Sequence, residues 1–364
     1  MKIKTITCHH VYNHGALLQA YALTEFLKGE GHDVSIIDYR PPYLDGHFKL
    51  WRSDSRYNRI GLGWAYILAK LPGRIRALKR KKAFDVFFDH YMPVTERIYH
   101  SVEELQACPP EADLYIAGSD QIWNTSFPNG KDPSFYLDFG NAKKISYAAS
   151  FATSKLHSGT EEFVKKELNN FDAISVREYS GKKILNQLGF NGEVVVDPVF
   201  LISKEKWDEV ATDCCKDDNY ILVYDFENNK DIQELAQRYA TLKHCKVFSI
   251  GPYHMEYPDK CFLNYGPDTF VGLIRNAHCV FSNSFHASAF SLIYNTPFFV
   301  VNRKDGLNNR MSDLLEHFSL IERLVSCDCK DETLISDPKW NNVTQIIEND
   351  IIMSQQWLKN SIKG

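Results

Sequence analysis

Residues 1–40 have the sequence MKIKTITCHHVYNHGALLQAYALTEFLKGEGHDVSIIDYR, in which two structural patterns alternate. The β-branched run Lys2–Cys8 predicts a strand, and the apolar spacing within Gly15–Leu27 predicts a helix. Glycines follow this helix and end it, and Val34–Tyr39 is typical of a second strand. A strand, a helix and a strand in this order indicate a βαβ unit with parallel strands.

The same alternation returns after residue 110 and extends to about residue 301. Further strands are expected at Leu114–Ala117, Lys144–Ala149, Ala173–Val176, Val194–Val196, Tyr220–Tyr224, Lys246–Ile250, Cys279–Ser282 and Pro297–Val301. Helices are expected between them at 159–170, Tyr179–Leu188, 229–242, Thr269–Asn276 and Phe285–Tyr294. The intervening basic segment has helical patches but no strand pattern. Strands that alternate with helices predict an α/β protein with parallel sheets.

Two domains are expected, because the chain has 364 residues and a domain averages about 150. The stretch from Asp197 to about Lys216 has mixed polarity and is the expected boundary. We predict an N-terminal Rossmann-like domain at 1–200, with a basic insertion at 43–110, and a C-terminal Rossmann-like domain at 201–338. An amphipathic helix at 339–362 is expected to return and complete the first domain. Two facing sheets of this kind would bind ligands in the interdomain cleft, where strand ends meet helix N-termini.

The overall composition argues against several classes of protein. The net charge is −4 and the sequence pI is about 6.4, so we expect no nucleic-acid partner. No run approaches the roughly 18 apolar residues of a membrane span, and no secretory signal is expected at the start. The nine cysteines form no Cys-x-x-Cys pair, so we expect no zinc ribbon and reduced thiols in a cytoplasmic protein.

The charge is unevenly distributed, because residues 47–82 contain eleven lysines and arginines and a single acid, Asp54. This segment therefore carries a charge of +10, against −14 for the remainder. Trp51, Tyr57 and Trp64 lie among the basic residues, a composition typical of a peripheral membrane contact, here at the inner leaflet of the cytoplasmic membrane. The alternative is a solvated pair of basic helices packed on the acidic remainder.

The loop between the first strand and the first helix is the first candidate site. Gly15 at the helix start would let a ligand approach the backbone, and Asn13 can donate or accept hydrogen bonds. The loop has neither a GxGxxG pattern nor a P-loop lysine, which disfavours those modes of nucleotide binding. Its three histidines lack the spacing of a metal site, so we expect no metal. A plain tight turn is the alternative.

The second candidate follows the strand Leu114–Ala117 directly and is rich in hydrogen-bonding side chains with one tryptophan. Its residues are Ser119, Asp120, Gln121, Trp123 and Asn124. Aromatic faces together with amides and carboxylates are suited to hold sugar rings and hydroxyls, so we expect a ligand here. The alternative is a helix N-cap by Ser119 or Asp120.

Cationic side chains follow three other strands. Arg177 leaves its strand toward the strand-end crevice, although it could instead pair with Glu178 on the surface. His286 lies in the first turn of a predicted helix, next to Ser284, where backbone N–H groups favour an anion. A histidine with a purely structural role is the alternative. Arg310 would add positive charge on the same side.

Taken together, these motifs resemble the polysaccharide pyruvyl transferase family. The resemblance rests on Tyr12–Leu23, Ile36–Pro41, Ala117–Asn124, Ser146–Phe151, Ser175–Glu178, Val196–Phe200, Ser284–Ala287 and Arg310–Leu315. It implies a fold like that of the GT-B glycosyltransferases, phosphoenolpyruvate as donor substrate, a saccharide acceptor, and donor binding by Arg177 and His286. The chain departs from the family at Ser284, where relatives tend to carry arginine.

We therefore predict a pyruvyltransferase that forms a pyruvate ketal on sugar hydroxyls of a surface or capsular polysaccharide precursor, free or lipid-linked, without cofactor or metal. His286 and Asp120 are the predicted catalytic residues. The donor would contact Arg177, Ser284, His286 and Arg310, and the acceptor would contact Asn13, Gly15, Ser119, Asp120, Gln121, Trp123 and Asn124. The alternatives are a GT-B nucleotide-sugar glycosyltransferase and a non-catalytic saccharide-binding protein.

Overall fold

The N-terminal domain is built on a parallel sheet whose strand order places the first strand in the middle. The computed structural model describes residues 1–44, 51, 55–59, 61–303 and 309–364, without the side chains of residues 55, 56, 309 and 310. The sheet has the order β3-β2-β1-β4-β5, formed by β1 (Lys2–Ile6), β2 (Asp33–Tyr39), β3 (Val94–Tyr99), β4 (Leu114–Ala117) and β5 (Lys143–Ser146). Parallel bridges from Ile145 to Ala173 and from Ala149 to Val176 continue it into β6 (Ser175–Val176) and β7 (Glu193–Val194).

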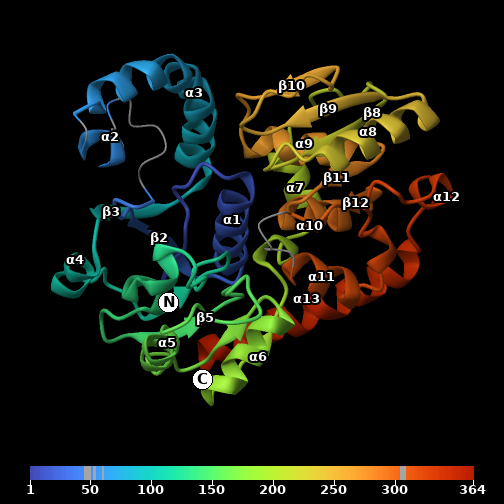
Figure 1. The fold of residues 1–364 in the computed structure, drawn as a ribbon. Helices are drawn as coiled ribbons and strands as arrows, with labels where there is room; N and C mark the ends of the chain where they lie inside the picture. Colours follow the sequence, from blue (N-terminus) through green and yellow to red (C-terminus); the bar gives the residue numbers. More distant parts are fainter. Residues whose placement is uncertain (45–50, 52–54, 60, 304–308) are drawn as a thin grey trace.

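The C-terminal domain repeats this arrangement. Its sheet has the order β10-β9-β8-β11-β12, formed by β8 (Tyr220–Tyr224), β9 (Lys246–Ile250), β10 (Lys260–Phe262), β11 (Val280–Ser282) and β12 (Phe298–Val300). All of these pairs are parallel. The strand order reverses between the first and fourth strands of each sheet, which is where ligands bind in such folds. The two sheets lie in separate lobes of one molecule (Figure 1), so the prediction of an α/β fold with two Rossmann-like domains is confirmed.

Helices cover the sheets and join the two domains. The N-terminal half contains α1 (His14–Gly29), α2 (Ser55–Arg59), α3 (Gly63–Tyr91), α4 (Val102–Ala107), α5 (Glu161–Leu168) and α6 (Tyr179–Leu188). The C-terminal half contains α7 (Lys204–Val210), α8 (Lys230–Lys243), α9 (Pro267–Asn276), α10 (Phe285–Tyr294), α11 (Asn309–His317), α12 (Asp331–Leu334) and α13 (Trp340–Lys363). None of the described helices is long and apolar enough to cross a membrane.

Helix α1 is apolar on nearly all sides because it lies between the two domains. One face carries Leu23 and Leu27, which pack in a core with the N-terminal strands. Another carries Leu17 and Tyr21, which belong to the core that extends through the C-terminal domain. The near-continuous apolar sequence of this helix therefore reflects contacts on both sides, and it fixes the domains against each other.

Helix α13 runs back to the N-terminal domain and passes behind α6 in Figure 1. Leu358 and Ile362 are buried in the same core as Ile3 and Leu23. The Ser354 hydroxyl accepts a hydrogen bond from the Val196 N–H at 3.0 Å. The last helix therefore packs against the first domain, as its amphipathic pattern predicts.

Two strands and one continuous helix differ from the sequence expectations. The expectation of no strand within 43–110 is wrong, because β3 lies there, and β10 was also not expected. Both are edge strands, which pair on one side only and so carry little apolar signal. From Gly63 onward the basic segment belongs to one continuous helix of 29 residues, α3, that contains Pro72 in its interior. A proline in a helix interior normally breaks or kinks the helix, so the continuity of α3 through Pro72 differs from the expected patches.

Candidate functional site

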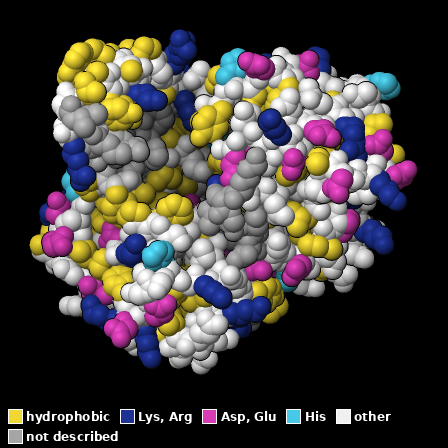
Figure 2. All heavy atoms as spheres, in the orientation of Figure 1, with side chains coloured by type: hydrophobic (Ala, Val, Ile, Leu, Met, Phe, Trp, Pro, Cys, Tyr) yellow, Lys and Arg dark blue, Asp and Glu magenta, His cyan; other side chains and the backbone are white. Residues whose placement is uncertain are grey.

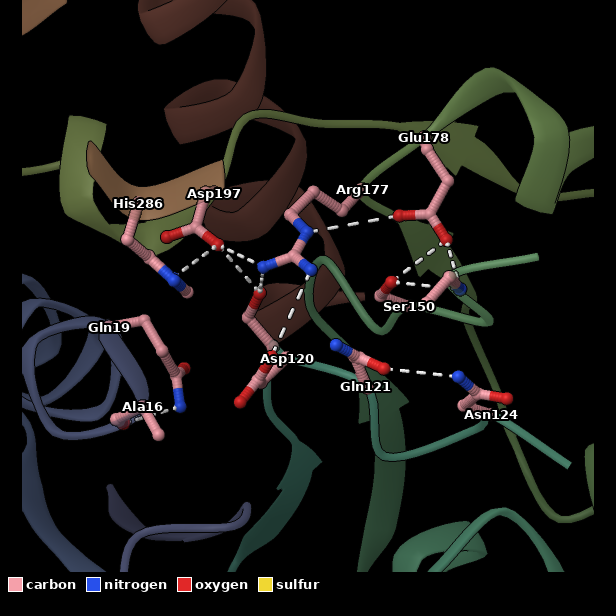
Figure 3. A network of polar contacts seen from close by, with 12 residues as sticks. Ala16, Gln19, Asp120, Gln121, Asn124, Ser150, Arg177, Glu178, Asp197 and His286 are labelled. Carbon is pink, nitrogen blue, oxygen red and sulfur yellow. Dashed lines mark hydrogen bonds and ion pairs between the residues drawn. The ribbon is translucent and has the colours of Figure 1, made fainter. Parts of the chain in front are cut away.

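Loops from both domains meet at the carboxyl ends of the strands. Arg177 follows β6, Asp197 follows β7, and Asp120 follows β4, all in the N-terminal domain. His286 comes from the first turn of α10 in the C-terminal domain. The close-up shows these side chains around one another, with the guanidinium of Arg177 in the middle (Figure 3). The structure therefore brings together Arg177, His286 and Asp120, three residues singled out from the sequence.

Asp197 is the main partner of Arg177. The Arg177 Nη1 donates a hydrogen bond to Asp197 Oδ2 at 2.6 Å, and the Ser119 hydroxyl donates to the same oxygen at 3.1 Å. Asp197 Oδ1 accepts from the backbone N–H of Val199 at 3.1 Å. Burial opposes ionisation of Asp197, yet the charges and hydrogen bonds of His286 and Arg177 hold its pKa well below its ordinary range. Asp197 is therefore a buried carboxylate and a fixed counter-ion.

Two more carboxylates surround the guanidinium at longer range. Arg177 Nε lies 3.8 Å from Glu178 Oε2, and Arg177 Nη2 lies 4.0 Å from Asp120 Oδ1. The phenyl ring of Phe285 packs against the guanidinium, with 4.3 Å between the Arg177 Cζ and the ring centroid. The expected surface pair of Arg177 with Glu178 is wrong, because both side chains are almost completely buried. Arg177 is thus held from three sides by acids.

His286 joins the cluster across the domain boundary. Its Nε2 lies 3.5 Å from Asp197 Oδ2, and its side chain is 8% exposed. The ring also approaches the start of α1 so closely that a Cβ on Gly15 would lie 2.0 Å from His286 Nδ1. Position 15 therefore has to be glycine to admit His286. This corrects the expectation that Gly15 makes room for a ligand, because the space beside its Cα is occupied by that ring.

Several buried polar atoms of the cluster have no hydrogen-bond partner. They are Arg177 Nε and Nη2, Glu178 Oε2 and His286 Nε2. A buried polar group without a partner costs free energy, so its presence in a folded protein calls for an explanation. A cavity of about 130 Å³ is lined by Arg177 and Glu178, together with Asp197, Phe285 and Asp313, but not by His286. The cluster can therefore offer hydrogen-bond donors from two domains to an anionic ligand.

The second sequence cluster is divided between the site and the protein core. Asp120 keeps 19% of its side chain exposed and adopts a left-handed backbone conformation with φ of 73°. Gln121 is half-buried, and its side-chain oxygen accepts a hydrogen bond from Asn124 Nδ2 at 3.0 Å. Ser119 is buried against Asp197. Asp120 and Gln121 are thus the members of this cluster that a ligand in the interdomain space could reach.

Trp123 does not reach the site, which corrects its expected role in acceptor binding. It is completely buried, and its indole N–H donates to the Phe135 carbonyl at 3.1 Å. Its ring stacks on Tyr136 with 5.5 Å between centroids. Asn124 is also completely buried. Both residues instead fix the shape of the loop that carries Asp120.

The remaining predicted residues lie at the edges of the cluster or outside the described part of the chain. Asn13 is the N-cap of α1, and its side chain accepts a hydrogen bond from the Ala16 N–H at 3.3 Å. Ser284 is buried at the N-terminus of α10, two residues before His286. The side chain of Arg310 lies outside the described residues.

The histidines of the first loop point to different partners and do not form one site. His9 Nε2 lies 3.2 Å from Asp38 Oδ1, whereas His14 Nδ1 lies 3.1 Å from the Tyr224 hydroxyl of the C-terminal domain. Burial and the charge of Arg80 hold the pKa of His14 well below its ordinary value. Among the described residues, no group of three potential ligands is arranged to hold a metal ion.

Sequence reasoning gave no role to Asp197 or Glu178. The sequence contains a weak signal for both. Asp197 directly follows the predicted strand Val194–Val196, and Glu178 directly follows Arg177. The Asp197-Pro198 pair is also a common way to start a turn, and Asp197 does cap the 3-10 turn Pro198–Phe200. Its charge pairing with Arg177 spans 20 residues, so only the fold shows it.

A comparison with known families identifies the family of this chain. A family model described as "Polysaccharide pyruvyl transferase" matches residues 13–305. This chain belongs to the polysaccharide pyruvyl transferase family. As a member of that family it is a transferase, which confirms the prediction of an enzyme and sets aside a non-catalytic binding protein. No curated protein is significantly similar to it in sequence.

Solved structures that resemble this polysaccharide pyruvyl transferase family member have the two-domain GT-B architecture. One is a protein from Listeria monocytogenes assigned as a UDP-N-acetylglucosamine 2-epimerase, with a TM-score of 0.50, 11% identity, and coverage of 98% of this chain and 90% of that one. Another is UGT89C1 from Arabidopsis thaliana in complex with quercetin, with a TM-score of 0.50, 9% identity, and 99% coverage of both chains. At such low identity they bear on the fold alone, and the expectation of a GT-B-like fold is confirmed.

Proposed function

We propose that this protein transfers the pyruvate group of phosphoenolpyruvate to two hydroxyls of a saccharide, forming a ketal and releasing phosphate. One observation carries the proposal. Arg177 and His286 come from different domains, meet at the strand ends and keep buried nitrogen atoms without hydrogen-bond partners. Phosphoenolpyruvate has two anionic groups, which an arginine and helix N-termini are suited to bind. The family match supports the same chemistry.

The reaction needs one proton transfer to carbon and two additions of hydroxyl oxygen. Protonation of the methylene carbon of the donor leaves an oxocarbenium-like centre at C2. One sugar hydroxyl adds there and loses its proton, and a second hydroxyl then displaces phosphate, which leaves with the C–O electron pair. The proton gained by carbon balances one of the two lost by the hydroxyls, and the other leaves with phosphate. As written, the reaction requires neither a redox cofactor nor a metal.

The residues of the cluster suggest a division of roles. We assign His286 to protonation of the donor or contact with its phosphate, because an imidazole side chain can donate both a proton and a hydrogen bond. Arg177 would bind a donor anion through its unpartnered Nη2 and Nε, with Ser284 and Arg310 completing the donor site. Asp120 would accept the proton of the attacking hydroxyl, because it is the carboxylate of the cluster with the most exposed side chain.

We assign the acceptor to a saccharide precursor of a surface or capsular polysaccharide, and the basic segment to contact with an anionic membrane surface. Trp64, Leu68 and Ile75 on α3 are 65%, 56% and 52% exposed, and their spacing places them on one face of the helix. Hydrophobic side chains gather over this part of the surface (Figure 2). Exposed apolar side chains among lysines and arginines match the interface of a bilayer that contains anionic lipids.

Phosphate release tests the proposed reaction. Wild-type protein is incubated with phosphoenolpyruvate and a panel of free and lipid-linked glycans, and inorganic phosphate is measured. We expect release with at least one glycan and a loss of at least about a hundredfold for His286→Ala. The matched control is His278→Ala, because His278 is exposed and lies before β11, at the opposite end of that strand. Near-wild-type turnover by His286→Ala would remove the assignment of His286.

Ligand stabilisation distinguishes this proposal from a nucleotide-sugar glycosyltransferase, for which the fold is the sole support. We expect phosphoenolpyruvate to raise the Tm of the wild type, and less so that of His286→Ala. Stabilisation by UDP- or GDP-sugars without any by phosphoenolpyruvate would favour the glycosyltransferase instead.

Co-sedimentation with vesicles that contain anionic lipids tests the membrane contact. We expect Trp64→Ser/Leu68→Ser to bind the vesicles more weakly than the wild type. The control Ile335→Ser/Ile352→Ser removes exposed apolar side chains outside the segment. Equal binding by both double variants and the wild type would contradict a membrane role for α3.

A further inference from the structure

A second polar site lies in a cleft between the two domains, on the side of α3. The cleft has a volume of about 680 Å³, within the usual range for ligand pockets. The loop Val11–Asn13 and the inner face of α3 form one wall, and the segments that follow β8 and β9 form the other. α3 stands beside the C-terminal domain in the ribbon view, and the surface is hollowed between them (Figures 1 and 2).

The charged side chains that line this cleft are all cationic. Arg76, Lys79 and Arg80 project into it from successive turns of α3, and His254 faces them from the C-terminal domain. None of the described residues that line the cleft is acidic. A low-dielectric cleft lined by one sign of charge raises the local concentration of ligands with the opposite charge.

Arg80 is a buried cation for which the described part of the chain provides no counter-ion. Its residue is 8% exposed, and its Nη1 has no hydrogen-bond partner. Its Nη2 donates to the Tyr12 carbonyl at 3.3 Å, and its guanidinium lies 4.9 Å from the Phe84 ring. None of the ion pairs among the described residues involves Arg80, and burial lowers its pKa. An unpaired buried charge is costly unless an anion completes the site.

Aromatic side chains complete the cleft. Tyr224, Phe226 and Tyr253 line the wall opposite Arg76 and Arg80. Faces of this kind pack against sugar rings, and tyrosine hydroxyls hydrogen-bond to polar ligands. The combination of clustered cations and aromatic walls fits a ligand with a phosphate part and a ring part.

The cleft also connects with the catalytic cluster through the first loop. Tyr12 and Asn13 line the cleft, and Gly15, two residues further along, touches the His286 ring. A ligand whose charged end lies at Arg80 could thus extend its sugar end along this loop toward His286.

We propose that this cleft binds the diphosphate of a sugar-diphosphate acceptor, with Arg80, Arg76 and Lys79 as its anion-binding residues. The inference rests on the proposed function, because it names the chemical class of the acceptor for that reaction. The diphosphate could belong to a lipid-linked sugar or to a nucleoside-diphosphate sugar. The cationic cleft recognises the group that both share.

Binding of inorganic pyrophosphate tests the site without any catalysis. Calorimetry is performed on wild type, Arg80→Gln and R76Q/K79Q. The side chains of Arg76 and Lys79 are exposed, so their replacement should leave the fold intact. We expect R76Q/K79Q and Arg80→Gln each to weaken binding about tenfold or more, because each removes charge-assisted hydrogen bonds. The control K155Q/K330Q makes the same charge change at exposed lysines that do not line the cleft. Equal affinity of R76Q/K79Q and wild type would overturn the proposal.

A comparison of two ligands identifies the source of the diphosphate. UDP-N-acetylglucosamine and a short-chain polyprenyl-diphosphate-linked N-acetylglucosamine are titrated under the same conditions. Tighter binding of one of them than of pyrophosphate, with loss in R76Q/K79Q, supports the proposal and names the source. If neither binds, the cleft does not recognise sugar diphosphates and the proposal fails.

Steady-state kinetics distinguish a failure of the diphosphate site from a failure of the proposed pyruvyl transfer. With an accepted sugar diphosphate, R76Q/K79Q should raise KM for the acceptor about tenfold and leave kcat unchanged. If wild type releases no phosphate from phosphoenolpyruvate with any glycan, the reaction is wrong, whereas pyrophosphate binding still decides the cleft. If R76Q/K79Q weakens binding of phosphoenolpyruvate but not of pyrophosphate, the cleft holds the donor and the acceptor proposal is overturned.

Discussion

Arg177 and Arg80 are both buried arginines between the two domains, but they have opposite surroundings. Arg177 is paired with Asp197 at 2.6 Å and has Glu178 and Asp120 within 4.0 Å. Arg80 contacts the Tyr12 carbonyl and the Phe84 ring, and no acid within the described ranges pairs with it. Arg177 is paired with acids of the protein and has Nε and Nη2 left without hydrogen bonds, whereas among the described residues no acid pairs with Arg80.

This difference shows that a buried cation can serve either the stability of the fold or the binding of a ligand. The charge of Arg177 positions side chains from both domains, so its loss should disturb the fold. The charge of Arg80 stabilises no acid, so its loss should disturb binding rather than folding. Four measurements, from the largest expected effect to the smallest, test this contrast.

Replacement of Arg177 should have the largest effect. Arg177→Met leaves Asp197 buried without its main counter-ion, so we expect the free energy of unfolding to fall by about 3–5 kcal/mol. Urea denaturation monitored by circular dichroism measures this change. R177M/D197N should recover part of the loss, because it also removes the orphaned charge. A loss below about 1 kcal/mol would show that the pair is not structural.

A methyl group at position 15 should disturb the Arg177 region alone. Gly15→Ala places a Cβ 2.0 Å from His286 Nδ1, so we expect a loss of about 1–3 kcal/mol and lower phosphate release. Pyrophosphate binding in the Arg80 cleft should not change. Gly29→Ala at the end of the same helix is the control, because nothing lies within 4 Å of its added Cβ. Equal stability of the two variants would contradict the close contact.

The Arg80 region should respond to pH through His14. Burial and the Arg80 charge lower the His14 pKa well below 6.5, so below that pH the unfolded chain binds a proton that the folded chain does not. Stability should therefore fall on acidification, by about 1 kcal/mol between pH 6.5 and about 5.5. His14→Gln should remove this contribution, as measured by urea denaturation at both pH values. Asp197 does not interfere, because its pKa is lowered from 3.8. An unchanged slope in His14→Gln would contradict the prediction.

Replacement of Arg80 should have the smallest effect on stability. Arg80→Met removes a buried charge without orphaning an acid, so we expect a change within about 1 kcal/mol of zero in the absence of ligand. The same variant should lose pyrophosphate affinity. Destabilisation as large as that of Arg177→Met would show that the two arginines play the same role and would break the comparison.

The local patterns that define the elements are strong in this sequence. β8, β9, α6 and α10 begin and end where periodicity predicts, because buried strands and amphipathic helices carry their signal in adjacent residues. The edge strand β3 (Val94–Tyr99) could not be predicted in the same way. Only Tyr99 is buried, the other five residues are exposed or half-buried without alternation, and the place of β3 in the sheet depends on pairing with β2, far away in sequence.

The sequence could likewise predict one part of the candidate site but not the other. Arg177, His286 and Asp120 could be singled out because each follows a predicted strand, and parallel strands end at one edge. Trp123 follows a strand as well, yet it turns into the core, because the space behind the loop is filled by Tyr136 and the Phe135 carbonyl. Which way a side chain turns after a strand depends on neighbours that the local pattern does not contain.

The sequence by itself determined the α/β class, the two domains and the strand ends at which Arg177 and His286 lie, because these follow from short-range periodicity. Only the tertiary structure decided that Asp197 pairs with Arg177, that Gly15 admits His286, and that Arg80 is buried with no acid of the described residues beside it. Each of these depends on the distance between residues from separate elements, and electrostatic compensation depends on that distance and on burial rather than on the order of residues.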